Sequence, residues 1–144
     1  MKLSTRSRYG LRAMVLVGAQ GGENISIKSI AESLGLSEAY LEQLFSPLKT
    51  AGIIGAARGA RGGYFLAKEP KDISVGDILR TLEGSLCPVE CLEDGSDECH
   101  CGDNCGTRCV TKNVWERMYD GINNAVNAIS LQHLISEYNT EMIK

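Results

Sequence analysis

Six cysteines crowd into one stretch of the chain, C-P-V-E-C-L-E-D-G-S-D-E-C-H-C-G-D-N-C-G-T-R-C, which runs from Cys87 to Cys109. The other parts of the 144-residue sequence contain no cysteine. Thiolates are soft ligands that suit zinc, copper(I) and iron–sulfur clusters, and the alternative use for so many thiols is a set of disulfides. The stretch also carries six acidic residues, one basic residue and almost no apolar content. We therefore expect it to be disordered without a bound metal.

The rest of the sequence bears on the choice between metal and disulfides. The first ten residues, M-K-L-S-T-R-S-R-Y-G, run into charge and glycine and contain no apolar h-region of a signal peptide. No apolar run approaches the roughly 18 residues that a membrane span requires. These features predict a cytoplasmic protein with no membrane partner. Because thiols stay reduced in that compartment, the prediction favours a metal site or redox sensing over structural disulfides.

Charge is divided unevenly along the chain. Residues 1–71 contain ten Lys/Arg and five Asp/Glu, a net charge of +5, whereas residues 72–144 contain five and thirteen, a net charge of −8. Such a division suggests that only the first half meets an anionic partner, although solvated faces can differ in charge by chance.

A first helix is predicted over residues 5–19, with Ser4 as its N-cap. Its apolar residues can share one face, and Arg6, Arg8 and Arg12 lie on the other side. These arginines either form a solvated surface or contact phosphates.

Two short helices follow with a glycine between them. The first covers residues 27–34 and ends at Gly35, and the second begins after the N-cap Ser37. We expect Pro47 to break or kink this second helix because it lacks a backbone donor. A helix pair of this kind is typical of the helix-turn-helix, whose second helix enters the DNA major groove, but it also occurs in proteins that do not bind DNA.

The next segment is predicted to be a β-hairpin, with strands over residues 53–57 and 64–67. Three glycines in the connection R-G-A-R-G-G supply the positive φ angles of a turn, and Arg58 and Arg61 project from its tip. A hairpin directly after a helix-turn-helix is a wing, and an arginine at its tip can enter the DNA minor groove. The alternative is an ordinary solvated turn.

The second half of the chain is predicted to contain three further helices. One is capped by Ser74 and Asp77 and ends at Gly84, a long one covers residues 111–128, and a last one follows Ser130. Apolar side chains recur every four residues in the long helix, which suggests a partner helix from a second subunit, although packing within the chain is nearly as good an explanation. The members of this stripe are Val110, Val114, Met118, Ile122 and Val126, widened by Trp115, Ala125 and Ile129.

These patterns predict a mainly α fold in three parts. Residues 1–84 form a winged helix-turn-helix DNA-binding domain, residues 85–109 a cysteine-rich cluster-binding loop, and residues 110–144 a dimerisation helix with a C-terminal helix.

Five segments, in this order, give the chain a close resemblance to the IscR/NsrR/CymR-type winged-helix transcription regulators. They are M-K-L-S-T-R-S-R-Y-G-L-R-A-M, L-S-E-A-Y-L-E-Q-L-F, R-G-A-R-G-G-Y-F-L, S-V-G-D-I-L-R-T-L-E-G and C-V-T-K-N-V-W. The resemblance implies a homodimer that binds a palindromic DNA operator and carries an iron–sulfur cluster, 2Fe-2S or 4Fe-4S, in the cysteine loop. It also implies that the state of the cluster alters DNA binding, so that a repressor senses iron–sulfur, iron, redox or nitrosative status.

The resemblance also implies roles for single residues in DNA binding. Tyr40, Glu42 and Gln43 fall where the recognition helix of the family approaches bases. Gln43 suits a bidentate contact to adenine, and Glu42 suits a cytosine amino group or the exclusion of other bases. Arg58 matches the wing arginine. Arg8 falls where nitric-oxide sensors of the family supply a carboxylate ligand from the partner subunit, which an arginine cannot replace, so we expect it to contact DNA instead.

The ligand set departs from the family pattern. Members similar to IscR have a histidine three residues after the last cysteine, and this chain has Lys112 there. The surplus of thiols, with His100 inside the loop, offers another solution. The spacing common in the family matches Cys99 and Cys105. We predict an all-cysteine site made of Cys91, Cys99, Cys105 and Cys109, with Cys101 in reserve and Cys87 as the thiol least suited to the role.

Two other functions remain open on the sequence. One is a DNA-binding regulator whose thiols hold zinc or disulfides without sensing, and the other is an iron–sulfur electron carrier. No enzymatic activity is predicted, because the sequence offers no nucleophile–base pair and G-A-R-G-G does not match a phosphate-binding loop.

Overall fold

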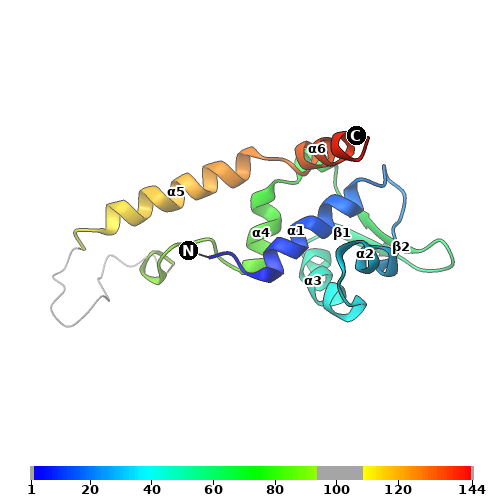
Figure 1. The fold of residues 1–144 in the computed structure, drawn as a ribbon. Coiled ribbons are helices and arrows are strands. Elements are labelled where there is room, and N and C mark those ends of the chain that lie inside the picture. Colours follow the sequence, from blue (N-terminus) through cyan, green and yellow to red (C-terminus); the bar gives the residue numbers. More distant parts are fainter. Residues whose placement is uncertain (1, 94–108, 144) are drawn as a thin grey trace.

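The structure, a computed structural model, describes residues 2–93 and 109–143. A body of helices and one hairpin is followed by a helix that extends away from it, α5, and by α6, which returns to the body (Figure 1). The predicted mainly α fold with a winged helix-turn-helix is confirmed. The elements are α1 (Thr5–Gly18), α2 (Ile27–Leu34), α3 (Glu38–Thr50), β1 (Ile54–Ala57), β2 (Gly63–Leu66), α4 (Val75–Glu83), α5 (Lys112–Ala128) and α6 (Leu131–Ile143), with short 3-10 helices at Pro70–Asp72 and Glu90–Leu92.

Serine side chains define where the helices of the body begin. Ser4, Ser26, Ser37 and Ser74 precede α1, α2, α3 and α4, and each hydroxyl accepts a hydrogen bond from the backbone N–H three residues further on. These bonds satisfy donors that a helix N-terminus otherwise leaves unpaired. The turn between α2 and α3 depends on Gly35, whose φ of 65° is left-handed and therefore favours glycine.

Of the break or kink predicted at Pro47, the break does not occur, since α3 continues through this residue to Thr50. Proline removes one backbone donor, but residues on both sides of it are held in the core: Phe45 is 1% exposed and Leu48 is fully buried. Burial of apolar side chains therefore outweighs the missing hydrogen bond.

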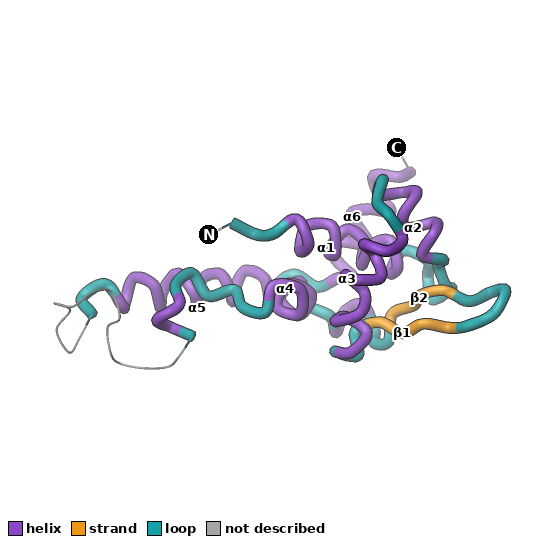
Figure 2. Tube along the Cα trace, turned by 90° about the horizontal axis from the view of Figure 1, so that it is seen from below, coloured by secondary structure: helices purple, strands orange, loops and turns teal. Residues whose placement is uncertain are grey.

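The core of the body forms around α1, which lies against α4 on one side and α6 on another (Figures 1 and 2). Two glycines allow the close approaches. A Cβ on Gly10 would overlap Cδ1 of Leu82, and a Cβ on Gly18 would overlap Cδ1 of Ile135. The largest apolar side chains sealed inside come from every helix of the body: Met14, Ile30, Leu41, Leu44, Phe45, Leu48, Ile78 and Leu131.

The hairpin forms where it was predicted, but β1 begins one residue later and β2 begins and ends one residue earlier than predicted. Its register pairs Ile54 with Leu66 and Ala57 with Gly63. Strand β2 is also paired to the body on its other edge, because Ile25 and Tyr64 exchange backbone hydrogen bonds of 3.0 and 2.8 Å. The wing is thus anchored to the segment that precedes α2.

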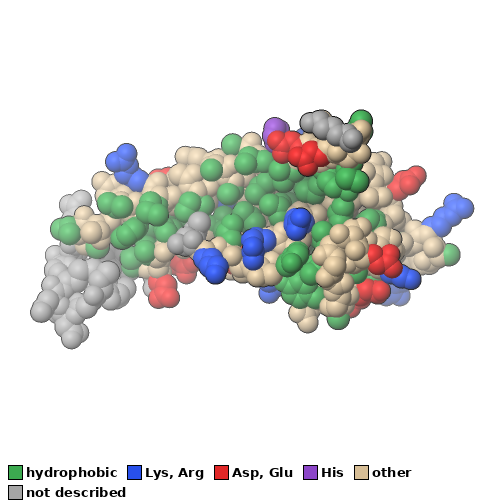
Figure 3. Space-filling model, in the orientation of Figure 1, with side chains coloured by type: hydrophobic (Ala, Val, Ile, Leu, Met, Phe, Trp, Pro, Cys, Tyr) green, Lys and Arg blue, Asp and Glu red, His purple; other side chains and the backbone are tan. Residues whose placement is uncertain are grey.

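The apolar residues of α5 do not share one face. Ile122 and Val126 pack on α4, whereas Val114 and Met118 remain 53% and 45% exposed. The reason is geometric: residues four apart advance by about 40° around a helix, so five of them span about 160°. Packing within the chain therefore accounts for Ile122 and Val126, and a partner helix from a second subunit stays a prediction for the exposed members. We call the exposed residues Val110, Val114, Met118 and Ile129 the outer stripe, and Figure 3 shows apolar side chains gathered over α5.

The last helix, α6, begins at the predicted cap, since Ser130 Oγ accepts a hydrogen bond from the His133 N–H at 3.3 Å. It packs into the same core as α1 through Leu131 and Ile135. Across residues 2–93 and 109–143, no helix combines the length and apolar character that crossing a lipid bilayer requires.

Candidate nucleic-acid interface and cysteine loop

The outer face of α3 is polar because its inner face is used entirely for the core. Leu41 and Leu44 are fully buried, which directs Glu42 and Gln43 into solvent. Tyr40 is half-buried and lies edge-on to Tyr9 of α1, with ring centroids 6.5 Å apart. Gln43 and Glu42 are thus available to a partner, and Tyr40 is held at the edge of this surface by α1.

The wing presents its two arginines at the tip of the hairpin. Arg58 and Arg61 are exposed, and the carbonyl of Arg61 accepts a hydrogen bond of 3.0 Å from Asn24 Nδ2. At the base of the wing, the rings of Phe45 and Tyr64 lie 4.6 Å apart. Since Phe45 belongs to α3, this contact fixes the wing relative to the predicted recognition helix.

Tyr64 is a residue of this surface that the sequence alone did not indicate. Burial raises the pKa of its phenol, and the negative charge of Glu42 raises it further. The Glu42 carboxylate therefore acts across the junction between α3 and the wing. An acceptor at this position suits a base amino group and repels phosphate. Glu42 and Tyr64 are far apart in the sequence, so no local pattern indicates that they lie close together.

Basic side chains also line α1 (Figure 3). Arg6, Arg8 and Arg12 are exposed, as predicted from their helical spacing. Arg8 donates a hydrogen bond of 3.3 Å to Thr5 Oγ1, which leaves the rest of its guanidinium facing solvent.

Glu83, at the end of α4, is a second residue that the sequence analysis missed. Its carboxylate accepts a hydrogen bond of 2.7 Å from the Ser4 N–H, so the start of α1 is tied to the end of α4. Burial raises the pKa of Glu83, but the Ser7 and Ser4 dipoles and the charge of Arg6 outweigh it and lower the pKa overall. The Ser7 hydroxyl itself is fully buried and has no partner within ordinary hydrogen-bond geometry.

The structure describes three of the six cysteines, which flank the central part of the cysteine loop. Cys91 lies in the 3-10 helix that follows α4, and Cys109 lies just before α5. Both thiols are half-buried, and these two flanks lie at the same end of the molecule (Figures 1 and 2). Cys87, which was predicted to be the thiol least suited to bind the cluster, donates a hydrogen bond from Sγ to the Val89 carbonyl at 3.3 Å. The predicted ligands Cys99, Cys101 and Cys105, with His100, lie outside the described residues.

Hydrogen bonds through Thr111 connect one predicted ligand to α5. Cys109 Sγ and Thr111 Oγ1 lie 3.2 Å apart, and Trp115 Nε1 donates to the same Thr111 oxygen at 3.3 Å. Lys112, at the position of the expected histidine, is the first residue of α5. Within the described part of the chain no three His, Cys, Asp or Glu side chains come together as a metal site needs, but the donor chemistry of the loop suits an iron–sulfur cluster.

Comparisons with known proteins agree with this architecture. Residues 3–137 match the model of the Rrf2 family, described as "Iron-dependent Transcriptional regulator". The regulator CymR of Bacillus subtilis is 55% identical over 95 residues, which cover 65% of this chain and 69% of CymR. The regulator IscR of Pectobacterium atrosepticum is 34% identical over 137 residues, 94% of this chain and 80% of IscR.

Solved structures give the same result. The structure described as "CymR (YrzC) the Global Cysteine Regulator of B. subtilis" superposes with a TM-score of 0.78 at 38% identity, and it covers 95% of this chain and 98% of that one. The resemblance read from the five sequence segments is therefore confirmed, and the relatives are regulators rather than enzymes. The chain belongs to the Rrf2 family of transcriptional regulators.

Proposed function

We propose that this regulator binds a two-fold symmetric DNA operator as a homodimer, and that an iron–sulfur cluster in the loop from Cys87 to Cys109 modulates the binding. The observation that carries the DNA part is the contact between Phe45 and Tyr64, at 4.6 Å, which joins the exposed polar face of α3 to the arginine-tipped wing. Two elements held in this way can engage adjacent grooves of one duplex.

In this proposal the base contacts come from α3. Gln43 reads adenine in the major groove, Glu42 accepts from a cytosine amino group, and Tyr40 packs at the edge of the contact. The wing arginines Arg58 and Arg61 enter the minor groove. Arg8 on α1 contacts the phosphate backbone and contributes affinity without reading sequence.

The homodimer is supported by the outer stripe of α5. Val114 and Met118 are 53% and 45% exposed on a helix that extends from the body, and Ile129, just after its end, is 39% exposed. A helix-turn-helix protein that binds two half-sites requires a second copy, and a two-fold interface brings the same stripe from both subunits together.

The proposed cluster ligands are Cys91, Cys99, Cys105 and Cys109, with Cys101 as the alternative thiol. When bound, the cluster supplies iron that reacts with oxidants and nitric oxide, and its presence depends on the supply of iron. The chain itself provides the coupling, because the loop connects the end of α4 to the start of α5. Folding of the loop on its metal would act on the Lys112 end of α5, where the two subunits of the proposed dimer would meet, and hence on the separation of the two recognition helices. A cytoplasmic location, where the thiols are reduced, belongs to this proposal.

A second candidate is a regulator without a cluster, in which the thiols hold zinc or disulfides. The similarity to CymR favours it, since that relative is described as a global cysteine regulator. A signal linked to cysteine supply is the corresponding function for this chain.

A single purification without oxygen distinguishes the two candidate functions by the colour and metal content of the protein. Protein prepared without oxygen should be brown, should show visible charge-transfer absorption and should contain iron and sulfide. Its affinity for an operator duplex should differ between the loaded and the metal-free protein across a salt series. Cys99→Ser should abolish the absorption, and Cys87→Ser is the matched control that should retain it. A colourless protein that contains zinc, or equal DNA affinity in both states, would refute the cluster proposal.

A further inference from the structure

Side chains of α5 lie directly over Gly76 of α4. A Cβ on this residue would overlap Asn127 Oδ1 and would lie 2.7 Å from Arg80 Nη2 and 3.0 Å from Val126 Cγ2. A larger residue at this position would displace the Asn127 amide and the Arg80 guanidinium. Gly76 therefore leaves room for the side chains through which α4 and α5 contact each other.

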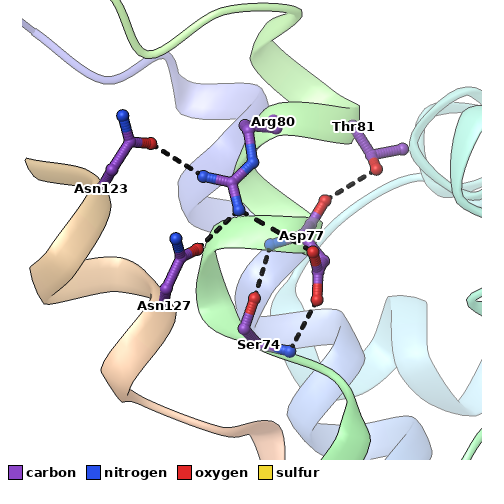
Figure 4. A network of polar contacts seen from close by, with 6 residues as sticks. All are labelled: Ser74, Asp77, Arg80, Thr81, Asn123 and Asn127. Atoms are coloured by element: carbon purple, nitrogen blue, oxygen red, sulfur yellow. Dashed lines mark hydrogen bonds and ion pairs between the residues drawn. The ribbon is translucent and has the colours of Figure 1, made fainter. Parts of the chain in front are cut away.

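Arg80 bridges the same two helices (Figure 4). Its Nη1 donates to Asn123 Oδ1 at 3.0 Å and its Nη2 donates to Asn127 Oδ1 at 2.5 Å. The two asparagines are one helical turn apart on α5, so the planar guanidinium spans a defined length of that helix. We call Arg80, Asn123, Asn127 and Gly76 the Arg80 clamp.

The clamp is supported on the α4 side. Arg80 Nη2 lies 3.8 Å from Asp77 Oδ1. Asp77 in turn accepts from the Ser74 N–H at 2.9 Å, and its own N–H donates to Ser74 Oγ at 3.0 Å (Figure 4). This reciprocal pair caps α4, so the guanidinium is oriented by a carboxylate that the helix start already fixes.

A second attachment fixes the end of α5. The Val75 N–H donates to the Ile129 carbonyl at 2.9 Å, and the Leu131 N–H donates to the Ile73 carbonyl at 2.8 Å. A rigid helix held at its end and again at the clamp has a defined direction. The remainder of α5, toward Lys112, extends away from the body (Figure 1).

We propose that the Arg80 clamp determines the spacing of the two operator half-sites, with Arg80, Asn123 and Asn127 as positioning residues that do not touch DNA. The inference rests on the proposed dimer through the outer stripe of α5. In such a dimer the direction of α5 sets how far apart the two α3 helices lie. A helix of 17 residues is about 25 Å long, so a tilt of about 10° displaces one end by about 4 Å. That displacement is similar to the rise of one base pair, about 3.4 Å.

The test begins with selection of bound duplexes from a random DNA library by the wild-type protein, purified in one metal state. The same selection is then made with the double variant Asn123→Ala/Asn127→Ala. Asn124→Ala is the matched control, because Asn124 is exposed on the same helix and lies outside the clamp. The enriched half-site is finally tested alone and in pairs whose spacer is changed by one or two base pairs.

The expected result is a loss of spacing preference. The double variant should bind a single half-site as the wild type does, while its preference for one spacer over neighbours one base pair longer or shorter falls by about tenfold, the scale of one misplaced base contact. Gly76→Ala should have the same effect, although alanine favours the helical state of α4. A cooperative thermal unfolding transition and an unchanged dimer mass verify that the variants are folded.

Two outcomes would overturn the inference in distinguishable ways. If the wild type enriches no two-fold sequence, the proposed dimeric DNA binding fails and the inference fails with it. If the wild type enriches a two-fold sequence and the double variant keeps the same spacer preference as Asn124→Ala, the clamp does not set the spacing and the proposed function stands. If the double variant does not fold, the spacer preference of Gly76→Ala is compared with that of Asn124→Ala instead, and the same two outcomes apply.

Discussion

Replacement of Met118 in the middle of the outer stripe tests the proposed dimer most directly. This residue is 45% exposed in the single chain. Full burial of a methionine side chain contributes roughly 1.5–3 kcal/mol, so covering the exposed share contributes about 1 kcal/mol in each copy. A two-fold interface contains the residue twice, which makes the contribution about 2 kcal/mol per dimer. We therefore expect Met118→Ala to raise the dimer dissociation constant by about 30-fold.

An acidic residue at the same position should have a larger effect. Met118→Asp would place two carboxylates near each other in an apolar contact, which costs several kcal/mol more than the lost area. We expect this variant to be monomeric at micromolar concentration. Its fold should be intact, because Met118 is 45% exposed and belongs to neither core cluster.

Sedimentation equilibrium over a concentration series measures both effects. Asn124→Asp is the control, since it introduces the same charge on the same exposed helix about 120° away from Met118. Thermal unfolding by circular dichroism establishes that each variant is folded. A dimer of wild-type strength in Met118→Asp, or a wild-type protein that is itself monomeric, would refute the assignment of the outer stripe as the interface.

Three further changes test other parts of the structure. Arg58→Ala should weaken operator binding and reduce the slope of log affinity against log salt by about one, because one positive charge that displaces counterions from the DNA is lost. Fluorescence anisotropy at several salt concentrations measures this slope, and an unchanged slope would contradict the wing assignment. Asp77→Asn should reduce the free energy of unfolding by about 1 kcal/mol at pH 7, since the Ser74 N–H loses a charged acceptor. Burial raises the pKa of Asp77, but hydrogen bonds from Ser74 and nearby positive charges lower the pKa overall from 3.8. The stabilisation that the Asp77 carboxylate provides is therefore present above pH 3.8 and is lost as the pH falls through the lower folded-state pKa. Urea unfolding at pH 7 and below pH 4 should show that the stability difference between wild type and variant shrinks in acid. Gly10→Ala should destabilise the fold by about 1–3 kcal/mol, because the new methyl group overlaps Leu82, and an unchanged urea midpoint would argue against this packing.

The local features of the DNA-binding part were readable without coordinates. Ser37 and Gly35 mark the helix-turn-helix because a hydroxyl satisfies an N-terminal donor and a glycine tolerates φ of 65°. The exposed face of α3, with Glu42 and Gln43, follows from the same helical periodicity that buries its neighbours. These properties depend on residues within one or two turns of each other, so a single sequence is sufficient to predict them.

Pro47 and α5 show where local patterns fail. The missing donor of Pro47 predicted a break, but burial of Phe45 and Leu48 by distant elements keeps α3 continuous. The four-residue spacing in α5 predicted one apolar face, but the position of α4 divides it into a packed side and the outer stripe. In both cases the outcome depends on what lies against the helix, which periodicity does not describe.

The cysteine loop, from which the functional argument started, was recognisable from residue types and spacing alone, as were the serine caps, the wing and the resemblance to a family of regulators. Contacts between residues that are distant in sequence became visible only in the tertiary structure. Arg80 meets Asn123 and Asn127 across separations of 43 and 47 residues, and Glu83 meets Ser4 across 79. Such contacts depend on the angles and distances between whole helices. These are set by the packing of the entire core, so no short segment of the chain carries them.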